Sequence, residues 1–194
     1  MGFSRAELLT FRGGSIPDLV GPQTRLLLVG INPGLATVAV QAHFSRRGNR
    51  FYPALYRAGI IDHVIDAADG FMPGDREHLL ERGVGITGLV PFATARADEL
   101  STAQLQDGAV ALEGRVRDIR PAVVAVLGIT AYRVAFGRPD AVVGEQPETI
   151  AGARLWVVPN PSGLNAHETI ASLAVAYREA AIAAGIDVYP SVER

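Results

Sequence analysis

Short, uninterrupted apolar runs set the pattern of this sequence and leave few folds open to it. The clearest run spans residues 121–127, and others span 25–30, 85–90 and 154–158. A strand that is apolar at nearly every position is buried on both faces, which is typical of parallel sheets covered by helices. Helical patterns separate the runs, at residues 49–58, 75–82, 101–119, 130–136 and 168–184. This alternation predicts an α/β fold, a three-layer α/β/α arrangement around a central, mainly parallel sheet of four to five strands.

The length of the chain fits one domain. With 194 residues, of which 48% are hydrophobic, we expect a single domain over residues 1–194 with one sizeable core. Residues 1–24 combine a short helical stretch with several glycines and prolines, so we predict an irregular N-terminal extension without a catalytic role. The polar stretch that carries Gly144 and Pro147 is predicted to be a loop.

The residue types that are absent or sparse exclude several kinds of chemistry. The chain has no cysteine, which excludes disulfides, thiolate nucleophiles and cysteine-based metal sites. Neither a membrane-spanning apolar run nor a signal-peptide layout is present, so we expect a cytoplasmic protein without a membrane partner, acting as a monomer. We expect no metal and no cofactor, because metal-ligand spacing is missing among the histidines, which are His43, His63, His78 and His167.

The run Gly-Ile-Asn-Pro-Gly at residues 30–34 directly follows the first apolar run. Pro33 has a restricted φ and favours an extended Asn32, which places the Asn32 amide at the carboxyl end of a strand. An amide oxygen there can orient a water molecule for attack, although it cannot remove a proton as a carboxylate does. Such a site suits a substrate whose leaving group departs readily. The same run also fits an ordinary turn, so the motif alone leaves both interpretations open.

A second segment, residues 43–52, mixes aromatic rings with arginines. This mixture suits a site that stacks a base and contacts phosphates, although a solvated loop before a helix has the same composition. Phe51 and Tyr52 are predicted to be core residues of the helix that follows. The candidates for base stacking and for phosphate contacts are Phe44, Arg46, Arg47 and Arg50.

The run Asn-Pro-Ser-Gly-Leu-Asn at residues 160–165 follows the fourth strand and carries an isolated leucine. An apolar side chain on a rigid loop can insert into a base stack while neighbouring backbone groups pair with the orphaned base. Leu164 is the candidate for this wedge, and a hydrophobic plug beneath the loop is the alternative. Ser162 is a candidate phosphate contact or turn cap, and it lacks the His and Asp at diagnostic spacing that a nucleophile needs.

In their order and spacing, these three segments resemble the Mug/TDG family of the uracil-DNA glycosylase superfamily. That family carries a Gly-Ile-Asn-Pro-Gly motif, a Gly-Asn-Arg-Phe-type segment and an Asn-Pro-Ser-Gly-Leu loop, and the combination is more specific than any one part. The similarity covers roughly residues 25–180. The resemblance implies a uracil-DNA glycosylase-like fold, double-stranded DNA with G:U or related mismatches as the partner, and hydrolysis of the N-glycosidic bond of a flipped base.

The resemblance also implies roles for individual residues. Asn32 would position the hydrolytic water, and Phe44 would stack on the flipped base. Leu164 would be the intercalating wedge, with main-chain contacts from its neighbours to the widowed guanine. The residues that would line the base pocket are Ile31, His43 and Phe44, and those of the wedge are Gly163, Leu164 and Asn165.

Several positions depart from the family's pattern. Phe92-Ala93-Thr94 stands where an Arg-Pro-Thr run is expected, Ala166 replaces a frequent arginine, and Gly88 replaces a longer side chain. These departures leave the shape of the pocket and the breadth of substrates open. The carboxylates Asp98 and Glu99 either assist the water or are surface charges at the start of a helix.

Three other interpretations remain beside the mismatch glycosylase. A glycosylase of the same superfamily could prefer single-stranded uracil, hypoxanthine or xanthine. The chain could also be a non-catalytic module that binds mismatched DNA, or a small-molecule enzyme that uses Ser162 with His167 as its base. The net charge of −2 does not decide among them, because binding a duplex requires positive charge on only one face.

Overall fold

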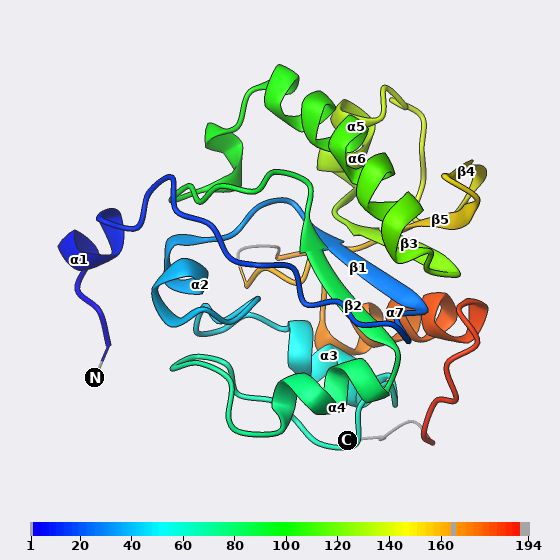
Figure 1. Cartoon of the computed structure of the whole chain (residues 1–194), viewed down its shortest axis with the longest axis horizontal. Coiled ribbons are helices and arrows are strands. Elements are labelled where there is room, and N and C mark those ends of the chain that lie inside the picture. Colours follow the sequence, from blue (N-terminus) through cyan, green and yellow to red (C-terminus); the bar gives the residue numbers. More distant parts are fainter. Residues whose placement is uncertain (1, 164–165, 191–194) are drawn as a thin grey trace.

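One five-stranded sheet organises the computed structural model, which describes residues 2–163 and 166–190 (Figure 1). The strand order is β2-β1-β3-β5-β4, in which the first four strands are parallel and β4 is antiparallel at one edge. The strands are β1 (Leu26–Gly30), β2 (Val84–Gly88), β3 (Val123–Leu127), β4 (Gly144–Ile150) and β5 (Ala153–Val158). The helices are α1 (Arg5–Leu9), α2 (Leu35–Val40), α3 (Phe51–Arg57), α4 (Asp75–Glu81), the short 3-10 helix η1 (Ala97–Glu99), α5 (Thr102–Ile119), α6 (Ile129–Ala135) and α7 (Ile170–Ala183).

Side chains alternate between the two faces of the sheet, and each face has its own apolar core. Leu26 and Leu28 of β1 pack with residues of α3, α4 and α7. Leu27 and Val29, which point the other way, pack with α5 and α6. All four side chains are fully buried, and Figure 1 shows the two groups of helices on opposite sides of the sheet. This confirms the predicted three-layer fold with a mainly parallel sheet. No helix within the described residues is both long and apolar enough to cross a bilayer.

The predicted elements occur within a few residues of their expected bounds, but three further elements do not follow from the sequence pattern. They are α2, the 3-10 helix η1 and β4, and because of β4 the prediction of a loop around Gly144 and Pro147 is wrong. Because β4 is an edge strand with alternating exposed and buried side chains, it lacks the apolar run that marks the inner strands. Pro147 fits there because the pairing of β4 with β5 is irregular between Glu145 and Thr149.

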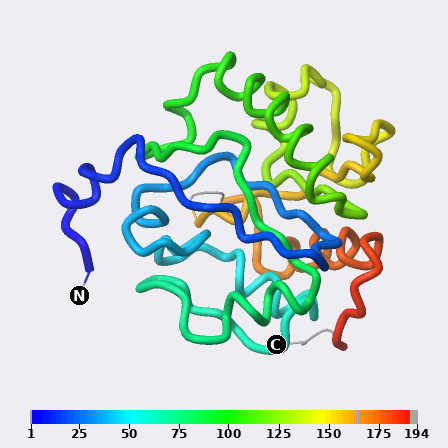
Figure 2. The backbone as a smooth tube through the Cα atoms, in the orientation of Figure 1, coloured from blue at the N-terminus to red at the C-terminus, as the bar shows by residue number. Residues whose placement is uncertain are grey.

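The N-terminal segment is irregular after α1, as predicted, but it runs along the edge of the sheet beside β2 (Figure 2). Leu19 and Ile86 exchange both of their backbone hydrogen bonds, at 2.9 and 2.7 Å. Gly13 and Gly14 exchange backbone hydrogen bonds with Ala93, in the loop after β2. The segment therefore forms part of the fold around the carboxyl end of β2.

The path of the chain changes direction along the sheet at β1. From β1 the chain continues to β2 on one side and then returns to β3 on the other side. Ligands of open parallel sheets bind outside the carboxyl ends of the strands at such a switch point. The two Asn-Pro runs follow β1 and β5, so both belong to this edge of the sheet.

Candidate active site

A pocket of about 180 Å³ lies over the carboxyl ends of β1, β2, β3 and β5. It is smaller than the roughly 300–1,000 Å³ of sites for drug-sized ligands, so it suits a single base better than a whole nucleotide. The predicted site residues that line it are Ile31, Asn32, His43, Phe44 and Arg46. Asn160 and Pro161 also line the pocket, so the structure brings together residues of all three sequence motifs.

The amide of Asn32 is held in one orientation. Its Nδ2 donates to Thr94 Oγ1 at 2.8 Å and to the Phe92 carbonyl oxygen at 3.1 Å. The Thr94 hydroxyl donates in turn to the carbonyl oxygen of Arg96 at 2.7 Å. Asn32 Oδ1 accepts no hydrogen bond from the described residues, which leaves it as an acceptor where Asn32 lines the pocket.

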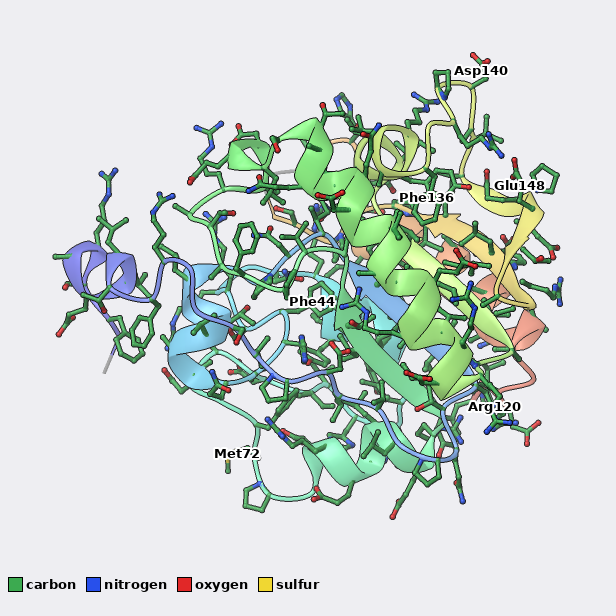
Figure 3. The ribbon with its side chains drawn as sticks, turned by 45° about the horizontal axis from the view of Figure 1, so that its top comes forward. Phe44, Met72, Arg120, Phe136, Asp140 and Glu148 are labelled. Atoms are coloured by element: carbon green, nitrogen blue, oxygen red, sulfur yellow. The ribbon has the colours of Figure 1, made fainter. Side chains whose placement is uncertain are left out.

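Phe44 occupies an unusual backbone conformation beside the pocket. Its φ is 55°, in the left-handed region that costs a non-glycine residue about 1 kcal/mol or more. Its ring stacks on Phe51, with centroids 3.8 Å apart and an interplanar angle of 18°. Phe51 and Tyr52 are buried core residues, as predicted, and the Tyr52 hydroxyl donates to the His43 carbonyl oxygen at 2.9 Å. Phe51 covers one face of the Phe44 ring, and Phe44 lines the pocket. Figure 3 places Phe44 toward the middle of the molecule.

His43 contributes a neutral imidazole to the pocket wall. Its side chain is buried, and burial is the main cause that lowers the pKa of His43 below its usual value. Nε2 lies 3.1 Å from the Pro17 carbonyl oxygen, which can only accept, so Nε2 carries the hydrogen. In this tautomer Nδ1 is an unprotonated acceptor.

The loop after β5 is anchored at its beginning. Asn160 Oδ1 accepts a hydrogen bond from the Ser162 N–H at 2.9 Å. The Arg50 N–H donates to the Pro161 carbonyl oxygen at 3.1 Å. The guanidinium of Arg50 donates to the carbonyl oxygens of Ser162 and Glu168. Arg50, predicted as a phosphate contact, therefore has a structural role in this loop.

Two glycines allow close approaches around the same loop. A Cβ on Gly163 would lie 2.7 Å from the Gly48 carbonyl oxygen, so the loop packs directly on the segment that carries the arginines. Gly128, at the end of β3, has a φ of 127°, and a Cβ there would lie 3.4 Å from Asn160 Nδ2. The remaining residues of the predicted wedge, Leu164 and Asn165, lie outside the described residues.

The other two predicted phosphate contacts differ in their surroundings. Arg46 is exposed at the pocket, and its guanidinium makes no hydrogen bond or ion pair with any residue that the structure describes. Arg47 is also exposed and pairs with Asp69 at 3.1 Å. Both members of that pair are largely solvated, so the interaction contributes little energy and does not prevent Arg47 from reaching a phosphate.

Sequence reasoning missed two residues that line the pocket and a third that is hydrogen-bonded to Asn32. Thr94 orients Asn32, although only its departure from a family pattern is visible in the sequence. Asp18 lies at the rim and accepts a hydrogen bond from the Thr87 hydroxyl at 2.6 Å. Arg115 of α5 also lines the pocket and donates to the Gly88 carbonyl oxygen at 2.8 Å. Asp18 belongs to the segment predicted to have no catalytic role, and no local motif marks either residue.

The two carboxylates considered as helpers of the water lie in surface ion pairs. Asp98 pairs with Arg96, and Glu99 pairs with Arg12 at 2.5 Å. Neither carboxylate lines the pocket. Their surroundings fit surface charges at a helix start, the second of the two interpretations.

The fold also brings together two histidines that are far apart in the sequence. The rings of His63 and His78 have centroids 4.8 Å apart, beside Asp62. The sequence shows no metal-ligand spacing among the histidines, and spacing along the chain does not report such contacts between elements. None of the three residues lines the pocket.

Comparisons with known proteins agree with this architecture. A family model described as the uracil DNA glycosylase superfamily matches residues 17–182 of the chain. Among solved structures, a match is the solution NMR structure of a protein from Methanosarcina acetivorans described as a candidate uracil DNA glycosylase. The two structures share a TM-score of 0.56 at 16% sequence identity, over 86% of this chain and 98% of that chain. At this identity the likeness concerns the fold alone.

Proposed function

Because this chain belongs to the uracil-DNA glycosylase superfamily, we propose that it is a monofunctional DNA glycosylase that removes uracil mispaired with guanine from duplex DNA. Thymine and etheno-cytosine opposite guanine are further candidate substrates, as the resemblance to the Mug/TDG family implies. The observation that carries the proposal is the orientation of the Asn32 amide, whose oxygen is left as an acceptor at a pocket the size of a base.

In the proposed reaction, Asn32 Oδ1 accepts a hydrogen bond from a water molecule and directs the water oxygen to C1′ of the flipped nucleotide. The water oxygen forms a bond to C1′ while the C1′–N1 bond breaks, and the electron pair of that bond leaves with the base. A neutral amide cannot take the proton that the water loses, so the proton passes to the departing base or to solvent. The reaction therefore depends on a leaving group that tolerates negative charge, as uracil does.

The pocket walls suit a flat pyrimidine that becomes negatively charged. Phe44 offers one ring face for stacking, and Phe51 supports the other face. The guanidinium of Arg115 lines the pocket and favours a departing anion where water is excluded. His43 adds a hydrogen-bonding wall without charge.

Preference for a base opposite guanine is proposed to arise in the loop after β5. Leu164 would fill the gap left by the flipped base, and the main chain of Gly163 and Asn165 would pair with the widowed guanine. The contacts of Asn160 and Arg50 support this role, because a loop that is anchored at its beginning loses less entropy when it inserts into DNA. A mispaired uracil also costs less to extrude than a paired one.

The substrate range is tested by measuring release of free base from matched duplexes that contain a G:U, A:U, G:T or G:C pair, and from single-stranded uracil. We expect G:U to react fastest and G:C not to react. Equal rates on G:U and single-stranded uracil would mean that the enzyme has no mismatch preference. Tight binding of the G:U duplex without release of any base would contradict the proposal and favour the non-catalytic module.

A further inference from the structure

A second polar cluster lies outside the pocket, where the segment between α3 and α4 meets α4. It consists of Asp62, His63 and His78, and each residue offers a ligand atom within 4.8 Å of those of the other two. From this arrangement we propose that the three side chains bind a divalent transition-metal ion, with Zn²⁺ as the ion that fits best. The site is separate from the glycosylase chemistry proposed above, because none of these residues lines the pocket.

The geometry of the cluster places a carboxylate oxygen between two imidazoles. Asp62 Oδ1 lies 2.6 Å from His63 Nδ1 and 3.2 Å from His78 Nε2. Despite that short distance, His78 Nε2 is buried and has no hydrogen bond with the described residues. A buried ring nitrogen in this state costs free energy unless it finds a partner. Two imidazole nitrogens and one carboxylate oxygen form a ligand set that zinc accepts, with a fourth position left for water.

Asp75 supplies the outer contact that a metal-bound histidine needs. Its Oδ1 lies 3.6 Å from His63 Nε2, slightly beyond hydrogen-bond length, and its Oδ2 accepts the Met72 N–H at 2.8 Å. Asp75 is itself buried, so its position is well defined. A metal on His63 Nδ1 leaves the Nε2 hydrogen facing this carboxylate. Carboxylates in this position orient metal-binding histidines and raise their affinity.

The types of the ligands and their places in the chain predict which ions bind and how a bound ion affects the stability of the fold. Two imidazoles favour zinc and its neighbours over Mg²⁺ and Ca²⁺, which prefer oxygen ligands. Asp62 and His63 belong to the segment between α3 and α4, whereas His78 belongs to α4, so the ion holds that segment against the helix. Figure 3 shows Met72, just before α4, at the periphery and away from Phe44. The ion is therefore a structural one, which stabilises the folded chain because the unfolded chain lacks the site.

The test is calorimetric titration of ZnCl₂ into the EDTA-treated and dialysed full-length protein, beside a titration with MgCl₂. We expect one Zn²⁺ per chain and no Mg²⁺. At a Zn²⁺ concentration about 100-fold above Kd, Tm is expected to rise by about 5 °C or more. His63→Gln and His78→Gln are each expected to abolish the binding and the rise in Tm. The matched control is His167→Gln, which removes a histidine outside the cluster and is expected to bind Zn²⁺ as the wild type does.

A variant of Asp75, the carboxylate that faces His63, distinguishes a specific Zn²⁺ site from nonspecific Zn²⁺ binding. Asp75→Asn is expected to weaken Zn²⁺ binding by about 10-fold. His63 is half exposed, so His63→Gln is expected to fold, and its circular dichroism spectrum checks this. Absence of Zn²⁺ binding by the wild type, or wild-type affinity in the folded His63→Gln variant, would overturn the proposal.

Discussion

Asn32 and Thr94 form one unit at the scale of single residues. The terminal amide of an asparagine can present either its oxygen or its NH₂ group, and only the oxygen can accept a hydrogen from water. The Thr94 hydroxyl gives its hydrogen to the Arg96 carbonyl oxygen and so can only accept from Asn32. The Phe92 carbonyl oxygen is likewise only an acceptor. Both partners therefore require Nδ2 to face them, which leaves Oδ1 as the acceptor for the proposed water.

Replacing Thr94 tests this coupling. Thr94→Val keeps the shape but removes the hydroxyl, and we expect base release from G:U duplexes to slow by roughly 10-fold, the equivalent of one hydrogen bond of about 1.4 kcal/mol. Binding of the duplex is expected to stay within about two-fold, because Thr94 would not touch DNA. The control is Thr94→Ser, which retains the hydroxyl and a near-normal rate. Equal single-turnover rates for Thr94→Val and Thr94→Ser would contradict the role of the Thr94 hydroxyl in orienting the Asn32 amide.

The buried imidazole of His43 makes stability depend on pH. Because burial lowers the pKa of folded His43 below the value of about 6.5 in the unfolded chain, the unfolded state takes up a proton first as pH falls. The free energy of unfolding should therefore decrease as pH falls from about 6.5 toward the lowered pKa, and level off below it. Urea unfolding at pH 7.5 and pH 5.5 should show a larger decrease for the wild type than for His43→Gln. The raised pKa of His63 acts in the opposite direction but is present in both proteins. An equal decrease in both would contradict this assignment.

Local motifs in the sequence, together with the family resemblance that they carry, predict Ile31, Asn32, His43 and Phe44 at the pocket. The same reasoning cannot find Thr94, Asp18 or Arg115. Their roles depend on which distant segments the sheet order brings to one edge, and a single sequence does not report that order.

At the scale of elements, β3 is the strand over which the two Asn-Pro loops meet. β1 and β5 are its neighbours on either side, and both loops follow their carboxyl ends. Gly128 directly after β3 takes a positive φ and leaves room for Asn160. The site therefore depends on the connection between β3 and α6, which consists of Gly128 alone and carries no side chain.

A substitution that adds one methyl group tests this connection. Gly128→Ala is expected to destabilise the protein by about 1–3 kcal/mol, because alanine is strained at this φ. Its Cβ also approaches Asn160 Nδ2, so base release is expected to slow. Gly114→Ala, at an open position in α5, is the matched control and is expected to stabilise the protein by about 0.5–1 kcal/mol. Urea unfolding measures both, and a Gly128→Ala variant as stable as the wild type would count against this account.

The inner strands could be predicted from the sequence because double burial leaves an apolar run, as in residues 123–127. β4 could not, since an edge strand with a proline and one solvated face has no such run. α2 could not either, because its six residues, Leu-Ala-Thr-Val-Ala-Val, are almost all apolar and show no alternation of apolar and polar positions with a helical period.

At the scale of the whole molecule, a net charge of −2 must coexist with the proposed binding of DNA. All 18 basic side chains are arginines, and most of those that the structure describes donate to carboxylates or carbonyl oxygens. Arg46 combines a place at the pocket with the absence of any such contact among the described residues. DNA binding should therefore rest on a small basic area rather than on the overall charge.

The dependence of DNA binding on salt concentration tests whether binding rests on a small basic area that includes Arg46. In an Asn32→Ala background, which prevents turnover, Arg46→Ala is expected to weaken G:U duplex binding and to reduce the slope of log K against log salt by about one. Arg138→Ala is the control of equal charge, because Arg138 pairs with Glu148, which lies at the periphery away from Phe44 (Figure 3). Equal effects of the two substitutions would mean that net charge, rather than Arg46, governs binding.

Asn32 is proposed to position the water that cleaves the glycosidic bond, and single-turnover release of uracil from a G:U duplex by wild type and Asn32→Ala tests this directly. We predict that Asn32→Ala binds the duplex as tightly as the wild type. Its rate of uracil release is expected to be at most about one hundredth of the wild-type rate. Release by Asn32→Ala at the wild-type rate would contradict the account, because the water would then be positioned by another group.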